Sequence, residues 1–113
     1  MGTEETKILK DVQTLAKKKG WVLFRNNVGL CKAVSGNFVR YGLCTGSSDL
    51  IGWKPRVITS EDVGMIIAQF VAVEVKTMKG KTTDEQIEFL RRVVTDGGIG
   101  KVIRNGREID DVV

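Results

Sequence analysis

MIIAQFVAVEVKTMKG, at residues 65–80, contains the most apolar run of the chain and ends in charged residues. Within residues 66–73 only Gln69 is polar, and many of the apolar residues are β-branched. This composition predicts a strand buried on both faces, as in the centre of a mixed or parallel sheet. We therefore expect the fold to be organised around this strand.

The end of this predicted strand is charged. Glu74 and Lys76 flank Val75, and because successive side chains of a strand point to opposite faces, the two charges share one face. An acid and an amine at the end of a core strand must be paired, hydrated or engaged in chemistry. The alternative is an ordinary surface pair on a frayed strand end, because Glu-x-Lys is common by chance. The apolar run before it favours a functional role.

The composition of the chain excludes several classes of function. Its 113 residues, 42% hydrophobic and 28% charged, are typical of one small soluble domain. Because it lacks a membrane-spanning run and an apolar signal-peptide core, we expect an intracellular protein with no membrane partner. The absence of histidine excludes histidine acid–base chemistry and most zinc sites. A net charge of +4 suits a nucleic-acid partner and, equally, an ordinary basic surface.

Hydrophobic periodicity and turn residues predict an α-β-β-β-β-α-β order of elements. The expected elements besides the apolar strand are a helix over residues 3–19, strands over 21–26, 38–43, 49–53 and 99–103, and a helix that follows Thr82 or Thr83. Residues 27–31 are expected to form a loop, and residues 56–59 are a candidate short strand. This order predicts an α/β or α+β fold, a single domain over residues 1–113 with helices flanking a central mixed sheet.

Several polar residues stand at element ends where apolar residues would be expected. Asp49 begins the strand over residues 49–53, and Gln86 lies near the buried face of the second helix, close to its start. With Glu74 and Lys76 they can converge where loops meet the sheet. Two carboxylates and a lysine, without histidine, favour a hard cation with oxygen ligands, Mg²⁺ or Mn²⁺.

The chemistry of such a site assigns a role to each of these residues. Asp49 and Glu74 hold the cation, and the backbone carbonyl of Val75 adds a ligand. The cation polarises a phosphate and lowers the pKa of a water. Lys76 positions that water or offsets charge on the phosphate, and Gln86 orients the lysine or contacts the phosphate.

Glu5 is a further candidate on the first helix. It lies three and four residues before Ile8 and Leu9 and therefore extends the apolar stripe of that helix. In the functional interpretation it is an outer ligand or a hydrogen-bond acceptor behind the ligands. The alternative is that Glu4 and Glu5 only complement the helix dipole.

Several segments of the chain carry a resemblance to a known family. They are the first-helix pattern from Glu5 to Gly20, FRNNVG at 24–29, YGLCTGSSDLIGW at 41–53, EDVG at 61–64, FVAVEVKT at 70–77 and TDEQIEFLRRVVTDGGIGKVI at 83–103. Together they resemble a VRR-NUC domain of the PD-(D/E)xK nuclease superfamily, in particular the small stand-alone versions carried by bacteriophages. The resemblance covers nearly the whole chain and implies a restriction-endonuclease-like core.

The resemblance also implies which residues form the site. The catalytic residues of the family fall on Asp49, Glu74, Lys76, Gln86 and Glu5. Ser48 departs from the pattern, because the superfamily often has proline before the aspartate. Proline there shapes the turn and binds no metal, so the departure concerns the geometry of the turn.

The activity implied by the resemblance is metal-dependent hydrolysis of phosphodiesters in DNA. Stand-alone domains of this type are similar to Holliday-junction resolvases that act as homodimers, so we expect a Mg²⁺-dependent endodeoxyribonuclease for four-way junctions. A phage-encoded protein would act in the host cytoplasm. Two alternatives stay open: a nuclease for flaps, single strands or duplex ends, and a DNA-binding module of the same fold without catalysis.

Basic residues are the candidates for contact with DNA. Lys79 and Lys81 are best placed because they directly follow the catalytic strand, and Arg25 and Arg40 are further candidates. For the other lysines and arginines a solvated surface charge is the simpler interpretation. No base specificity is expected, because a junction is recognised by its shape and its phosphates.

Overall fold

The computed structural model describes residues 3–111, whose contacts fall into two compact units, up to Lys54 and from Pro55 onward. The first unit contains α1 (Thr3–Lys18), β1 (Val22–Arg25), β2 (Gly29–Lys32), β3 (Phe38–Tyr41) and β4 (Leu50–Trp53). The second contains the 3₁₀ helix η1 (Ser60–Asp62), β5 (Val71–Val75), α2 (Asp84–Thr95), β6 (Ile99–Ile103) and the 3₁₀ helix η2 (Gly106–Asp111). No helix within residues 3–111 is long and apolar enough to cross a membrane.

Local signals explain where α1 begins and ends. Acidic residues occupy its first turn and lysines its last, as the helix dipole favours. Gly20 has a left-handed φ of +79°, and its N–H donates to the carbonyl of Lys17 at 3.1 Å. The N–H of Trp21 donates to the carbonyl of Ala16 at 2.9 Å, which completes a Schellman-type end. The helix is thus confirmed over nearly the predicted range, and the chain turns directly into β1.

Two antiparallel pairs of strands follow in the first unit. β1 pairs with β4, and Gly52 in this pair has no room for a side chain because a Cβ would lie 1.8 Å from the carbonyl oxygen of Val22. β2 pairs with β3 as a hairpin whose turn contains Gly36, with a φ of +92°. Residues 27–31 were expected to be a loop, so the strand Gly29–Lys32 is a correction. Residues 29–32 form a strand because they pair with β3, and the local sequence pattern does not predict this pairing.

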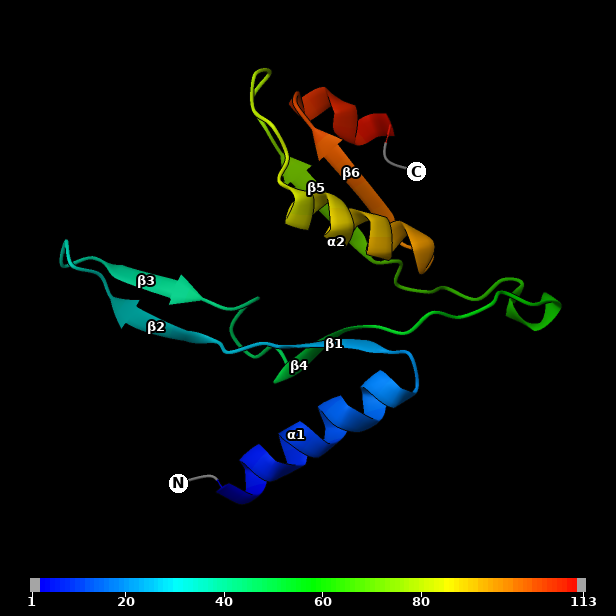
Figure 1. The fold of residues 1–113 in the computed structure, drawn as a ribbon, viewed down its shortest axis with the longest axis horizontal. Helices are drawn as coiled ribbons and strands as arrows, with labels where there is room; N and C mark the ends of the chain where they lie inside the picture. The colour runs from blue at the N-terminus through cyan, green and yellow to red at the C-terminus, as the bar shows by residue number, and fades with distance from the viewer. Residues whose placement is uncertain (1–2, 112–113) are drawn as a thin grey trace. The chain divides into compact units, whose positions relative to one another are not determined.

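The second unit is a β5-α2-β6 unit with α2 packed on two parallel strands (Figure 1). Val93 of α2 and Ile103 of β6 are buried between these elements. Glycine in β6 allows the close approach of the helix, because a Cβ on Gly100 would lie 2.9 Å from the carbonyl oxygen of Leu90. The predicted second helix and last strand are therefore confirmed, and β6 pairs with β5 along its whole length.

The strand predicted from the apolar run of residues 66–73 is shorter and less buried than expected. β5 begins only at Val71, and the apolar residues 65–70 belong to no strand. Ile66 is 98% exposed, and Val75 within β5 is 71% exposed. Apolar β-branched residues favour extended backbone, but burial on both faces needs neighbours on both faces. Among the described residues β5 pairs only with β6, so the prediction of a doubly buried strand is wrong.

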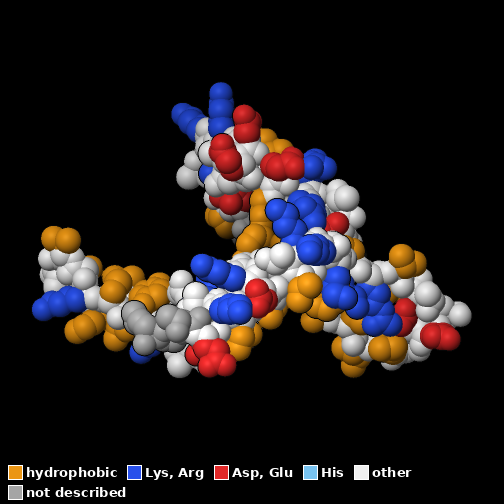
Figure 2. All heavy atoms as spheres, turned by 60° about the horizontal axis from the view of Figure 1, so that its bottom comes forward, with side chains coloured by type: hydrophobic (Ala, Val, Ile, Leu, Met, Phe, Trp, Pro, Cys, Tyr) orange, Lys and Arg blue, Asp and Glu red, His pale blue; other side chains and the backbone are white. Residues whose placement is uncertain are grey.

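The class of mixed helices and strands is confirmed, whereas the expected single central sheet is not. Within residues 3–111 the strands form three two-stranded sheets, and residues 56–59 form no strand. Large hydrophobic side chains stay exposed in both units, among them Ile8, Leu15 and Met78. Figure 2 shows such side chains at the surface beside lysines and arginines. Much apolar surface is therefore accessible on each unit.

Candidate active site

The charged end of β5 forms one compact group. Glu74 is in β5 and Lys76 directly follows it, and the Lys76 N–H donates to the Ile103 carbonyl of β6 at 3.0 Å. The two side chains share a face, and the Lys76 ammonium lies 3.5 Å from Glu74 Oε2. The Lys76 side chain is 20% exposed and the Glu74 side chain 29% exposed, so water screens the pair less than it would at an open surface. The predicted juxtaposition of this acid and this amine is present.

Gln86 joins this group from the start of α2. Its Nε2 donates to Glu74 Oε2 at 3.0 Å. Thr83 is the N-cap of α2, and its hydroxyl accepts from the Gln86 N–H at 3.1 Å. The Thr83 N–H in turn donates to Gln86 Oε1 at 2.9 Å, which makes a capping box. The first turn of α2 thus places the Gln86 side-chain amide within hydrogen-bond distance of the Glu74 carboxylate.

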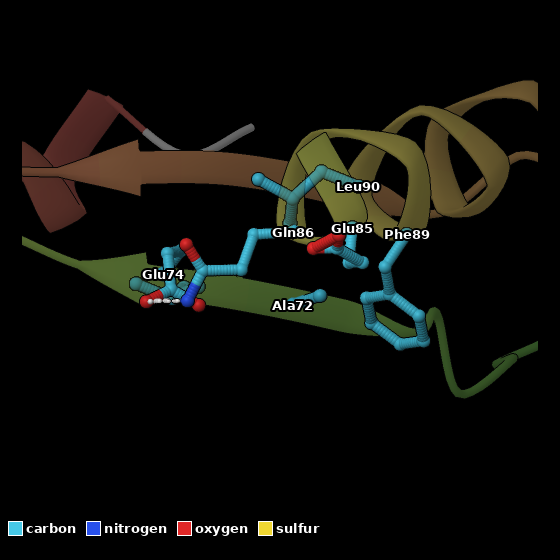
Figure 3. A pocket seen from close by; sticks show the side chains of 7 residues that line it. Ala72, Glu74, Glu85, Gln86, Phe89 and Leu90 are labelled. Carbon is cyan, nitrogen blue, oxygen red and sulfur yellow. Dashed lines mark hydrogen bonds between the residues drawn. The ribbon is translucent and has the colours of Figure 1, made fainter. Parts of the chain in front are cut away.

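A cavity of about 260 Å³ lies beside this group, between β5 and α2. Glu74, Glu85 and Gln86 supply its polar lining, and its apolar lining comes from Ala72, Val73, Phe89 and Leu90. In Figure 3 the Gln86 side chain extends from α2 to Glu74, while the Phe89 ring lies further along the strand. The carboxylate is therefore reached from one side by the amide and borders an accessible hollow.

The turn after β5 is held by a residue that the sequence analysis did not single out. Nη1 of Arg104 donates to the carbonyls of Thr77 and Gly80, each at 2.6 Å. The Gly80 N–H also donates a hydrogen bond to the Thr77 carbonyl at 3.1 Å. Lys79 and Lys81, the leading candidates for DNA contact, are exposed in and beside this turn. No local pattern marks Arg104, because its partners lie more than twenty residues earlier in the chain.

Asp49 lies in the first unit, immediately before β4. Its backbone carbonyl accepts from the Asn26 N–H at 2.8 Å, and the Asn26 side chain donates to the Ser48 carbonyl at 2.8 Å and to Ser47 Oγ at 2.7 Å. The Oδ1 of Asn26 also accepts a hydrogen bond from the Leu43 N–H at 3.0 Å. Asn26 was not predicted to belong to the site, and its side chain braces the turn before Asp49.

The remaining candidates of the first unit are exposed. Glu5 is in the first turn of α1 and is exposed, so the apolar stripe that it was expected to extend is not buried at this end of the helix. The stripe itself is largely accessible, since Ile8 of α1 is 55% exposed. Arg25 and Arg40 are exposed on β1 and β3, and the Nε of Arg25 donates to Asn27 Oδ1 at 3.0 Å.

The chemistry of the acidic residues fits a hard divalent cation. Both contacts of the Glu74 carboxylate are to Oε2, and within residues 3–111 Oε1 accepts no hydrogen bond. The Asp49 carboxylate is exposed and likewise has no bonded partner among these residues. Carboxylate oxygens are the ligands that Mg²⁺ and Mn²⁺ prefer. Neither unit, over its described residues, holds three or more acidic or cysteine side chains clustered for a metal.

The family of the chain follows from comparison with known proteins. The family model of the VRR-NUC domain matches residues 3–105, so it covers most of the chain and spans both compact units. The chain therefore belongs to the VRR-NUC family. It carries a nuclease-type domain, for which DNA is the substrate. Comparisons with curated proteins and with solved structures find no match.

Proposed function

We propose that this protein is a Mg²⁺-dependent endodeoxyribonuclease that cuts four-way DNA junctions as a homodimer, with both units parts of one VRR-NUC domain. The observation that carries the proposal is the contact of Gln86 and Lys76 with one oxygen of Glu74, inside a chain of a nuclease family. We also propose that the protein acts inside a cell, in the host cytoplasm if a phage encodes it.

Each side chain of the proposed site has a distinct task. Asp49 and Glu74 would hold Mg²⁺ or Mn²⁺, with the Val75 carbonyl as a further ligand and Glu5 as an outer acceptor. When bound, the cation supplies positive charge that polarises the scissile phosphodiester. Lys76 holds an ammonium group beside the carboxylate and offsets charge that develops on the phosphate.

Four exposed basic residues are proposed to contact the phosphates of the substrate. Lys79 and Lys81 flank the turn after β5, and Arg25 and Arg40 lie on β1 and β3. They differ from the two arginines of α2, because Arg91 pairs with Glu88 and Arg92 pairs with Asp96. Contacts to phosphate depend on charge and not on base identity, so cleavage should follow DNA shape.

Substitution of the two charged residues tests the proposed site. We expect Glu74→Gln and Lys76→Met to lower single-turnover cleavage of a four-way junction by about 100-fold or more, because the first weakens a proposed ligand of the cation and the second removes a positive charge that would stabilise the transition state. Chelation by EDTA should abolish cleavage by the wild type. Glu88→Gln, on the outer face of α2, is the matched control and should cleave normally. Wild-type rates for both charged variants would refute the assignment.

A substrate panel separates the junction activity from its alternatives. Wild-type protein with Mg²⁺ or Mn²⁺ should cleave a four-way junction faster than a flap, a single strand or a plain duplex. Preference for the flap or for duplex ends would replace the junction assignment with the alternative nuclease. Binding that weakens with salt, without cleavage of any substrate, would identify a DNA-binding module.

A further inference from the structure

We propose that Thr83 is a positioning residue of the active site, because its capping box sets the orientation of the Gln86 amide toward Glu74. The inference rests on the proposed nuclease function and deepens it. Thr83 itself is exposed and touches neither Glu74 nor Lys76 in any hydrogen bond or ion pair of the described residues. It acts through Gln86.

The amide of Gln86 has two unlike ends, and the structure uses each end once. Oε1 accepts from the Thr83 N–H at 2.9 Å, and Nε2 donates to Glu74 Oε2 at 3.0 Å. The reversed amide would put an NH₂ group against the Thr83 N–H and an oxygen against the carboxylate oxygen. Both contacts would then be repulsive, so the two bonds select the same orientation.

The hydroxyl of Thr83 holds this arrangement from the helix side. It accepts from the Gln86 N–H at 3.1 Å and keeps Thr83 in an extended conformation, with φ −80° and ψ 162°. That conformation aims the Thr83 N–H at Oε1 of Gln86. The cap of α2 and the orientation of the amide are therefore one hydrogen-bonded unit, and the loss of the hydroxyl loosens both.

The orientation of the Gln86 amide places a hydrogen-bond donor on one oxygen of the Glu74 carboxylate. Because the Gln86 amide and the Lys76 ammonium both approach Oε2, Oε1 of Glu74 is the oxygen that would be available to a cation. Gln86 presents a donor to Glu74, and its side-chain carbonyl oxygen accepts from the Thr83 N–H of the cap. Gln86 is thus assigned as an orienting donor to Glu74, and Thr83 sets that role.

Three variants test the inference against a matched control. Thr83→Ala removes the hydroxyl, Thr83→Ser retains it, and Gln86→Glu keeps an acceptor for the cap but loses the donor to Glu74. Thr82→Ala is the control, because it removes the neighbouring hydroxyl, which makes no hydrogen bond in the described residues. All four proteins should be compared at a temperature well below their unfolding transitions, monitored by circular dichroism.

The first readout is kinetic. Thr83→Ala should lower kcat for junction cleavage by about 10- to 100-fold, as is typical when a group behind a metal ligand is lost, and leave KM for DNA nearly unchanged. Thr83→Ser should restore kcat, and Thr82→Ala should match the wild type. Gln86→Glu should lose activity although its helix cap is intact. Equal kcat for Thr83→Ala and wild type would overturn the inference.

The second readout does not depend on cleavage. In ¹⁵N-labelled protein the side-chain NH₂ protons of Gln86 should exchange slowly with water and resonate away from those of exposed glutamines. Thr83→Ala should abolish this protection, and Thr83→Ser should retain it. If the wild type fails to cleave DNA, the proposed function fails while this measurement still decides the orientation. Unchanged Gln86 resonances in Thr83→Ala would overturn the positioning role.

Discussion

One oxygen of Glu74 receives both the Gln86 amide, at 3.0 Å, and the Lys76 ammonium, at 3.5 Å. A half-buried carboxylate is stable only when such partners compensate for its lost hydration. At the scale of single residues, the contacts that stabilise the folded carboxylate use one of its oxygens, and the proposed function assigns the other oxygen to a cation.

Asp62 gives a prediction about pH at the same scale. The Thr59 N–H donates to Asp62 Oδ2 at 2.9 Å and lowers the pKa of this carboxyl below its ordinary value of 3.8, with a smaller contribution from Arg56. A lowered pKa stabilises the fold above the unfolded value, and this stabilisation is lost as the pH falls through the folded value. Asp62→Asn should therefore be less stable than wild type at neutral pH.

The measurement is urea unfolding of both proteins from pH 7 down to the acid limit of folding, beside an NMR titration of the Asp62 carboxyl. The stability difference should be complete at neutral pH and shrink below pH 3.8. A titration midpoint at or above that value would contradict the structural account of η1.

At the scale of elements, the turn between β5 and α2 depends on Arg104 at the end of β6. Its guanidinium joins two carbonyls of the turn, and its backbone N–H donates to Glu108 Oε1 at 2.9 Å. Because β5 and β6 are parallel, the end of β6 lies beside the end of the strand that carries Glu74. One side chain therefore orders the segment that presents Lys79 and Lys81.

Substitution of Arg104 should disturb both stability and DNA binding. Arg104→Met should lower the free energy of unfolding by about 1–3 kcal/mol, because two hydrogen bonds from a charged donor are lost and the Gly80 carbonyl loses this partner. It should also weaken binding to a four-way junction, measured with a catalytically inactive Glu74→Gln background. Arg104→Lys keeps the charge but not the planar donor group. Full recovery by lysine would show that charge alone matters.

At the scale of the whole molecule, exposed apolar side chains support the proposed homodimer. Ile8 and Leu15 of α1, and Val57 and Ile67 of the second unit, are all more than half exposed. Apolar surface of this kind favours association with a second copy. A two-fold dimer would also present two active sites to two strands of a symmetric junction.

The dimer prediction is tested by mass and by mixed dimers. Light scattering should give twice the mass of one chain. A purified heterodimer of wild-type and Glu74→Gln chains should nick one strand of a junction, because only one of its two sites retains both carboxylates. A monomer that still cuts both strands at the wild-type rate would exclude the two-site mechanism.

Residues close to each other in the sequence correctly predicted one end of each α-helix and the shared face of Glu74 and Lys76. Thr82 or Thr83 before two acids predicted the start of α2, and the structure shows that Thr83 is the N-cap; Gly20 after three lysines predicted the end of α1. Such signals succeed because caps and helix ends are satisfied by groups within a few residues of one another. The alternation of side chains along a strand likewise predicted that Glu74 and Lys76 share a face.

The predictions were wrong or incomplete where the structure depends on contacts between segments that are distant in the sequence. β2 was expected to be a loop because its strand partner lies across a turn, and the apolar residues 65–70 were expected in a strand that they do not join. The partners of Arg104 and Asn26 were not predicted, because their hydrogen bonds cross about twenty residues or more. No pattern of local hydrophobicity encodes such contacts.

The sequence by itself determined the family, the mixed class of fold and the acid, amine and amide of the candidate site. It did so because residue types, their spacing and local caps are properties of short segments. Only the tertiary structure decided that Gln86 meets Glu74 through a donor, that Arg104 holds the following turn and that β5 is a short, half-exposed strand. These features depend on which segments lie against one another, and that is settled by packing between elements rather than within them.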